Sequence, residues 1–222
     1  MMGYIILTVR SMSWMLLTLM ATLMIYSALL NPSWLTAKPQ MATFENETIS
    51  YTPSVGVYAK CIKPISLNHP SCTFIGIDGL ATDSEIYPTV WKAATLFLYF
   101  GLFIMSITVV TSIISCCFQS IFRKSIFTLS GVAQGVAGIS FIVCVMLYPM
   151  AWGTTRVQKL CGRDASPFYI NDCSIGNGLY VAVFGTLLTF ACACLSLPAE
   201  KSTSSDKVQD EIFKGRRFIC LK

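Results

Sequence analysis

The chain of 222 residues is 54% hydrophobic and only 12% charged, with a formal net charge of +5 and a mean hydropathy of +0.63. Charged residues make up about a quarter of an average soluble domain, so this composition excludes an ordinary soluble domain and indicates a membrane protein. The sequence also lacks the basic groove with interleaved aromatic residues that is typical of nucleic-acid binding. No nucleic-acid partner is therefore expected.

The first predicted element is a membrane helix over about residues 12–30. No charged residue lies between Arg10 and Lys38, and the run is long enough to cross a hydrocarbon core of about 30 Å. A cleaved signal peptide is the alternative, since Arg10 provides a basic flank, but the apolar run is too long and no convincing Ala-x-Ala site follows. Trp14 and Trp34 flank the helix and are predicted to be interfacial aromatics.

Residues 31–91 form the first loop, which is too long to be a simple connector. Strand-like pieces are expected around residues 49–51 and 55–58, bounded by Pro53 and Pro64. Asn46 begins an Asn-Glu-Thr glycosylation sequon, which is used only in a luminal or extracellular loop.

The rest of the chain alternates between apolar runs and short polar segments. The predicted segments are a second helix at about 93–122, a third at about 125–148, a second loop at about 153–173, a fourth helix at about 175–197 and a polar tail at 199–222. Pro149 is expected to end the third helix, and Tyr148 and Trp152 to lie at the membrane interface. Residues 1–222 are thus predicted to form one tetraspan domain.

The distribution of basic residues predicts the orientation of the helices. Arg10, Arg123, Lys124 and the six basic residues of the tail give nine in the segments assigned to the cytosol, against seven in the outer loops, which are about twice as long. Both termini are therefore predicted to be cytosolic. We expect an integral, multi-pass protein of the plasma membrane.

Four of the ten cysteines fall in the outer loops: Cys61 and Cys72 in the first, and Cys161 and Cys173 in the second. An oxidising exterior favours disulfides, and of the three possible pairings the simplest joins cysteines within each loop. A zinc site is the alternative, but His69 is the only histidine and has no partner at a ligand spacing. No metal or cofactor is expected.

Five of the six remaining cysteines lie toward the cytosolic side, in or beside the apolar runs. Cys116 and Cys117 lie toward the inner end of the second helix, Cys192 and Cys194 toward that of the fourth, and Cys220 near the C-terminus. Juxtamembrane cysteines are candidates for palmitoylation, notably Cys116, Cys117 and Cys220. Packing as small apolar residues is the alternative.

The third helix carries a small-residue face formed by Gly131, Gly135 and Gly138, with Gln134 among them. Close packing within the bundle is the favoured interpretation, with Gln134 supplying an interhelical hydrogen bond, and homodimerisation is the alternative.

The predicted helices contain almost no ionisable residues, which argues against a pump or transporter. No nucleophile elbow, phosphate loop or paired-carboxylate site is recognisable, so an enzyme is not expected.

The order of Trp34, Gly56-Val57-Tyr58 and Cys61, followed by Cys72, resembles the W–GLW–C–C signature of claudin-like tetraspans, with Val57-Tyr58 in place of Leu-Trp. Further segments narrow the resemblance to the lipoma HMGIC fusion partner-like (LHFPL) family, and most closely to its type-2 branch. These segments are Ser11-Met12, Tyr58-Ala59-Lys60-Cys61, Lys124-Ser125-Ile126-Phe127, Gln134 to Gly138, Leu147-Tyr148-Pro149-x-x-Trp152-Gly153, Thr203 to Gln209 and Ile219-Cys220-Leu221.

The resemblance implies an all-α four-helix transmembrane bundle with a small extracellular antiparallel sheet, built mostly from loop one and joined by a strand from loop two. It also implies a non-enzymatic auxiliary or scaffold subunit that binds a partner membrane protein, such as a channel, receptor or adhesion protein, and regulates its assembly, trafficking or gating. Homo-oligomers remain possible. The alternative is a claudin-like junction protein that forms a paracellular seal or pore.

Overall fold

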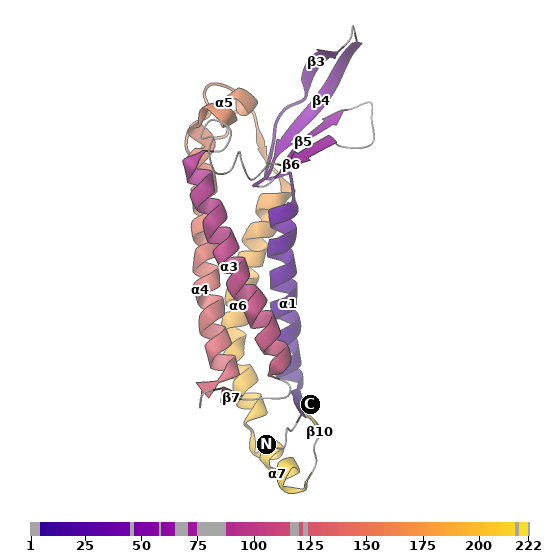
Figure 1. Ribbon diagram of the computed structural model, residues 1–222, viewed down its shortest axis with the longest axis vertical. Helices are drawn as coiled ribbons and strands as arrows, with labels where there is room; N and C mark the ends of the chain where they lie inside the picture. Colours follow the sequence, from indigo (N-terminus) through magenta and orange to yellow (C-terminus); the bar gives the residue numbers. More distant parts are fainter. Residues whose placement is uncertain are drawn as a thin grey trace. The chain divides into compact units, whose positions relative to one another are not determined.

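The computed structural model describes residues 5–44, 47–57, 59–64, 71–74, 88–115, 120–121, 124–215 and 218–221. Within these ranges four helices are long and apolar enough to cross a membrane (Figure 1). They are α1 (Val9–Leu30), α3 (Thr89–Ile114), α4 (Ile126–Met150) and α6 (Asn177–Thr203). The predicted four-helix membrane bundle is confirmed.

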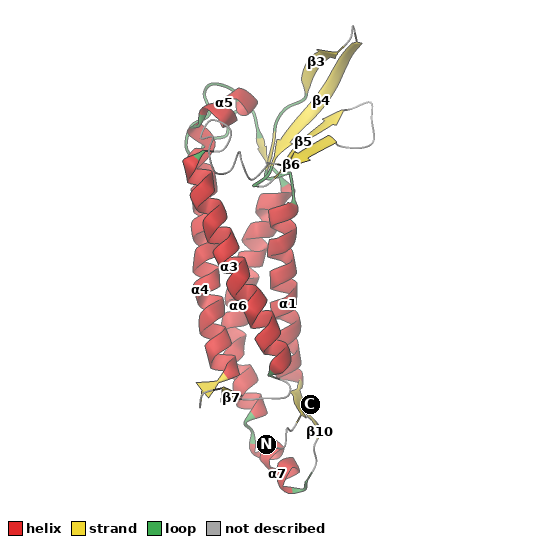
Figure 2. Ribbon diagram, viewed as in Figure 1, coloured by secondary structure: helices red, strands yellow, loops and turns green. Residues whose placement is uncertain are grey.

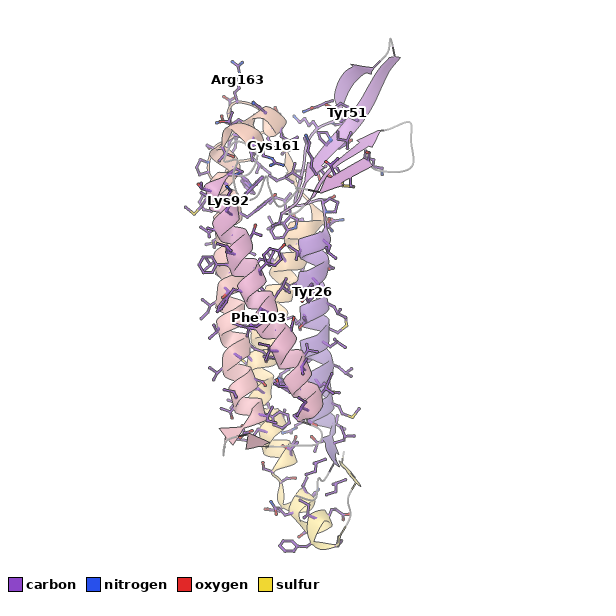
Figure 3. The ribbon with its side chains drawn as sticks, in the orientation of Figure 1. Tyr26, Tyr51, Lys92, Phe103, Cys161 and Arg163 are labelled. Atoms are coloured by element: carbon purple, nitrogen blue, oxygen red, sulfur yellow. A yellow bond between two sulfur atoms is a disulfide. The ribbon has the colours of Figure 1, made fainter. Side chains whose placement is uncertain are left out.

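The helices place large apolar side chains on the outside and small hydroxyl groups inside, as a lipid environment favours. Thr18 and Thr189 are fully buried, and each donates its hydroxyl to the carbonyl one turn earlier in its own helix. Leu16 on α1, Ile139 on α4 and Leu187 on α6 are each at least 55% exposed. Phe103 on α3 is 65% exposed and points outward (Figure 3).

Two helices continue past the ends expected from the sequence. Pro149 lies inside α4, which ends at Met150, and Pro198 lies inside α6, which continues to Thr203. Proline removes one N–H donor, but membrane helices tolerate it where neighbouring groups satisfy the freed carbonyl. A proline in an apolar run is therefore a weak stop signal for such helices.

The chain divides into two compact units, and each contains parts of all four helices. One unit comprises residues 1–24, 100–140 and 185–222, and the other comprises residues 25–99 and 141–184. We call the first the terminal unit, because it holds both chain ends, and the second the sheet unit.

The sheet unit contains an antiparallel sheet, drawn in yellow in Figure 2. Its strand order is β6-β5-β4-β2-β9, and β3 also pairs with β4. The strands are β2 (Leu35–Thr36), β3 (Gln40–Phe44), β4 (Glu47–Val55), β5 (Ala59–Pro64), β6 (Ser71–Phe74) and β9 (Ser174–Ile175). Five of these strands come from loop one and β9 from loop two, so the expected sheet is confirmed.

The strand piece expected around residues 49–51 continues through Pro53 to Val55 as β4, so the prediction that Pro53 bounds it is wrong. Of the piece expected at 55–58, Val55 is the strand residue among those described. Ladder pairs join Tyr51 to Gln40 on β3 and Ser54 to Thr36 on β2, so Pro53 faces the gap between these two strands. Its carbonyl accepts the N–H of Ala37 at 2.9 Å. The missing proline N–H therefore interrupts neither ladder.

In the terminal unit, the tail expected to be a polar extension is folded. The short helix α7 (Asp206–Phe213) is followed by β10 (Phe218–Leu221), which pairs in parallel with β1 (Ile5–Thr8) (Figure 1). Ile6, Val208 and Ile219 form a small buried cluster. This cluster holds the first and last segments of the chain together.

The strands β7 (Ser120–Ile121) and β8 (Lys124–Ser125) form a short hairpin before α4.

The aromatic residues expected at the membrane interface are buried within the protein. Trp14, Trp34 and Tyr148 are at most 1% exposed, and Trp152 is 5% exposed. Trp14 packs against Phe127 with ring centroids 5.2 Å apart, and its indole N–H donates to the carbonyl of Cys192 at 3.1 Å. Their position at the ends of helices predicts how deep they lie in the membrane. Their burial depends on which helices pack beside them, and the sequence does not specify those neighbours.

Candidate functional site

Three aromatic residues, Trp34, Trp91 and Tyr148, connect the sheet to the helices of the sheet unit, and we call them the aromatic anchor. Tyr148 stacks on Trp91 with ring centroids 5.2 Å apart and planes inclined by 6°, and its ring lies 4.8 Å from that of Trp34. Such aromatic pairs contribute about 0.5–1.5 kcal/mol each beyond the area that they bury. The residues come from α3, α4 and the segment after α1, so one cluster joins three chain segments.

Hydrogen bonds fix the orientation of each ring in the aromatic anchor. Trp34 donates its indole N–H to the carbonyl of Ala28 at 2.7 Å, and Trp91 donates to the carbonyl of Tyr148 at 3.1 Å. The phenol of Tyr148 donates to the carbonyl of Val55, the last residue of β4, at 3.3 Å. The sheet is therefore fastened to α4 by a specific contact at its base.

Two glycines permit close packing around Trp34. A Cβ atom on Gly56 would collide with the carbonyl oxygen of Asn31 and would lie 2.9 Å from the Cα of Pro32. A Cβ atom on Gly178, in the first turn of α6, would lie 2.8 Å from the indole nitrogen of Trp34. The structure thus brings Trp34 and Gly56 of the family motif to the same backbone turn. Gly178 is not among the residues singled out from the sequence. The one feature of the sequence that could have indicated its role is a glycine in the first turn of a helix.

The structure contains two disulfides, and each lies within one loop. Cys61 on β5 bonds to Cys72 on β6, directly opposite it in the ladder. Cys161 ends α5 (Thr155–Cys161) and bonds to Cys173, immediately before β9 (Figure 3). One bridge therefore closes a strand pair, and the other ties strand β9 to a helix.

Lys38 and Asp172 form an ion pair at 2.6 Å, but both are largely exposed, so the contribution of this ion pair to stability is small.

The outer edge of the sheet presents an apolar side chain. β3 pairs with β4 only, among the strands that the structure describes, and its Met41 is 81% exposed. The opposite edge strand, β6, is exposed at Ser71 and Thr73 and is polar there. An edge strand with free backbone groups and an exposed apolar residue is a common surface for binding another chain.

In the terminal unit, the small-residue face of α4 divides into two parts. Cβ atoms on Gly131 and Gly138 would collide with Ser196 and Phe190 of α6, respectively, whereas one on Gly135 would meet nothing within 4 Å. Gln134 is fully buried and donates to the hydroxyl of Thr18 on α1 at 2.9 Å. Two of the three glycines and Gln134 thus pack against neighbouring helices, and Gly135 does not.

This difference predicts opposite effects for two similar substitutions. Gly138→Ala is expected to lower the free energy of unfolding by about 1–3 kcal/mol, because its methyl group must displace the ring of Phe190. Gly135→Ala, on the same helix, is expected to be neutral or stabilising by up to about 1 kcal/mol, because its methyl group meets no other atom and alanine favours the helix. Thermal unfolding of both variants in the same detergent measures the difference. Equal melting temperatures would contradict this account of the packing.

Four predicted site residues lie outside the described residues: Asn46, Tyr58, Cys116 and Cys117. His69, which is not favoured as a zinc ligand, also lies outside them. Cys220 belongs to β10. Of the cysteines on α6, Cys192 is buried and Cys194 is exposed, so Cys192 is a packing residue. In the described ranges, no three His, Cys, Asp or Glu side chains are grouped so as to hold a metal ion.

Four membrane helices with a disulfide-bonded sheet between the first two define an integral, multi-pass tetraspan protein. Residues 10–198 match the family model of the lipoma HMGIC fusion partner-like proteins. The chain belongs to this family, as its motifs predicted. The family is one of tetraspan membrane proteins and is not known for enzymes.

Two relatives match along nearly the whole chain and agree with the predicted branch. The human LHFPL tetraspan subfamily member 2 protein is 37% identical over 227 residues, covering 99% of this chain and 100% of its own length. The zebrafish member 2a protein is 38% identical over 234 residues, with the same coverage. The zebrafish member 3 protein is 28% identical over 105 residues, covering 46% of each chain.

Proposed function

We propose that this protein is a non-enzymatic auxiliary or scaffold subunit that binds another integral membrane protein and supports its assembly, trafficking or regulation. The observation that carries the proposal is the free edge strand β3, with Met41 81% exposed, on a sheet whose base is fixed by the aromatic anchor. A preorganised surface loses little conformational freedom when it binds, which favours stable association.

The lipid-exposed helix faces are expected to contribute less to the choice of partner. Their apolar side chains are as well solvated by lipid tails as by another apolar helix, so association there depends on close packing. Gly135 is the glycine on α4 that leaves room for such an approach. In this proposal the sheet supplies specificity, and the helices supply additional contact area.

The proposed orientation places the sheet outside and both termini in the cytosol, at the plasma membrane. It rests on the distribution of basic residues. They are more frequent in the segment before the first helix, the turn between the second and third helices and the tail than in the two loops that form the sheet. The two disulfides agree with it, because disulfides persist in an oxidising exterior. A C-terminal tag that antibodies reach without permeabilising the cells would overturn the orientation.

Affinity capture from native membranes in mild detergent, followed by quantitative mass spectrometry, tests partner binding. We expect one dominant membrane protein to be recovered with the wild-type chain and to be reduced about tenfold or more by Met41→Glu, which places a charge in the contact. Phe213→Glu is the matched control, because Phe213 is 87% exposed on α7 and lies far from Met41 in the sequence. Its recovery of the partner is expected to equal that of wild type.

Two results would contradict the proposal. If no stoichiometric membrane partner is recovered, the protein does not act as a subunit. If the chain recovers only copies of itself, particularly between neighbouring cells, an adhesive or junctional role is the better account.

A further inference from the structure

A cavity of about 290 Å³ in the terminal unit combines basic and hydroxyl side chains. Its polar lining residues are Arg10, Lys201, Lys207, Thr8, Ser202 and Ser205. No aspartate or glutamate lines it among the residues that the structure describes. We call this cavity the basic pocket.

Four chain segments bring these side chains together. Thr8 ends β1, and Arg10 lies in the first turn of α1, which follows directly. Lys201 and Ser202 belong to the last turn of α6, and Lys207 lies in the first turn of α7. The hydroxyls of Thr8 and Ser202 are 2.7 Å apart and hydrogen-bonded, which joins the start of α1 to the end of α6.

The positive charge of the basic pocket is not neutralised by the described part of the chain. Arg10, Lys201 and Lys207 form no ion pair with any described residue. The carboxylate of Glu200, next to Lys201, accepts a hydrogen bond from Thr128 on α4 instead. Asp206 is exposed and does not line the cavity. The pocket therefore carries several cations with unused hydrogen-bond donors.

The start of α7 adds a second feature that favours an anion. Ser205 precedes the helix but does not cap it, because its hydroxyl donates to the carbonyl of Ser202 at 3.1 Å. Among the described residues, the N–H groups of Asp206 and Lys207 have no hydrogen-bond partner, whereas that of Val208 donates to the carbonyl of Ser205 at 2.9 Å, and the helix dipole makes this end positive. An anion in the pocket would meet these groups as well as the basic side chains.

The position of the pocket along the chain places it at the level of the lipid headgroups. Arg10 immediately precedes the uncharged run of α1, and no charged residue lies on α6 before Glu200 and Lys201. Basic residues at the cytosolic ends of membrane helices attract anionic headgroups, by about 1 kcal/mol for each residue near the surface.

From this combination we propose that the basic pocket binds a phosphorylated inositol, as carried by a phosphoinositide headgroup or by a soluble inositol phosphate. A phosphomonoester has a charge of about −1.5 to −2 and three strong acceptor oxygens, which suit paired cations and hydroxyl donors better than a singly charged headgroup does. The inference goes beyond the proposed function, since it needs no protein partner, and it rests on that proposal only for the cytosolic orientation of the chain ends.

The test uses the full-length protein in nanodiscs of phosphatidylcholine, with either phosphatidylinositol 4,5-bisphosphate or phosphatidylserine added at equal total lipid charge. Bound lipid is counted by native mass spectrometry. We expect preferential binding of the bisphosphate, weakened about fivefold by Lys201→Gln or Lys207→Gln and about 20-fold or more by both. The matched control is Lys214→Gln, which removes the same charge from the tail, because Lys214 pairs with Glu211 and does not line the pocket.

Soluble inositol 1,4,5-trisphosphate is added as a competitor to distinguish the two sources. Displacement of the lipid at similar concentrations supports the pocket and identifies a soluble ligand, whereas displacement only at a large excess supports it and identifies the membrane lipid. The proposal is overturned if phosphatidylserine binds equally well, or if Lys214→Gln weakens binding as much as Lys201→Gln does. Thermal unfolding of each variant checks that the fold is retained.

Discussion

Trp34→Ala is expected to lower the free energy of unfolding by about 3–5 kcal/mol and to prevent the protein from reaching the cell surface. Trp34 is fully buried, packs against Tyr148 and donates its indole N–H to Ala28. Its removal leaves a large cavity where the sheet joins the helices, and the carbonyl of Ala28 loses one hydrogen bond while it keeps the one from the N–H of Asn31. The thermal unfolding midpoint in detergent and the fraction of protein at the surface measure the two effects.

Trp34→Phe separates packing from hydrogen bonding at the same position. Phenylalanine retains much of the aromatic contact with Tyr148 but cannot donate to Ala28, so we expect a loss of about 1–3 kcal/mol and partial surface expression. If Trp34→Ala unfolds at the wild-type temperature, the aromatic anchor does not hold the sheet in place.

Cys161→Ser is expected to produce the second large effect. Without this bridge, which spans 12 positions, the unfolded chain regains about 3 kcal/mol of conformational freedom, and β9 loses its covalent link to α5. Cys161 is also fully buried, so the serine hydroxyl enters an apolar site and Cys173 is left unpaired. We expect retention in the endoplasmic reticulum. Surface biotinylation and non-reducing gels detect the retained and mispaired forms.

Cys61→Ser tests the other disulfide and serves as the comparison. The bridge spans a similar length, 11 positions, but Cys72 is exposed and the β5–β6 ladder can hold the two strands together without it. The predicted loss is a few kcal/mol, smaller than for Cys161→Ser, again with some retention. Normal surface levels of Cys61→Ser would show that this bridge is dispensable. Equal losses for both variants would contradict a larger role for the Cys161–Cys173 bridge.

The parts of the fold that were predictable from sequence depend on local composition. Uncharged apolar runs indicate membrane helices wherever they occur, and the cysteine positions indicate loop-local bridges once topology places them outside. The family motif contains both Trp34 and Gly56, but their order along the chain does not predict that they lie close together. The contact is a close approach of backbone segments at Asn31 and Pro32, which is visible only in three dimensions.

Other features were not predictable because they depend on contacts between distant segments. The parallel pairing of β1 with β10 joins Ile6 to Ile219, and α7 is too short to be indicated by periodicity alone. The basic pocket arises from the same pairing and from the Thr8–Ser202 hydrogen bond. Counting basic residues in the sequence identifies Arg10, Lys201 and Lys207, but it does not show that their side chains line one cavity.

Photocrosslinking at position 41 tests partner binding through β3 most directly. A photoreactive amino acid replaces Met41 in one variant and Phe213 in the other, and both are illuminated in native membranes. We predict that position 41 forms one abundant adduct with a different integral membrane protein, and that position 213 does not form it. Adducts at position 41 that contain only this chain, or no adduct at all, would contradict an auxiliary role that acts through the sheet.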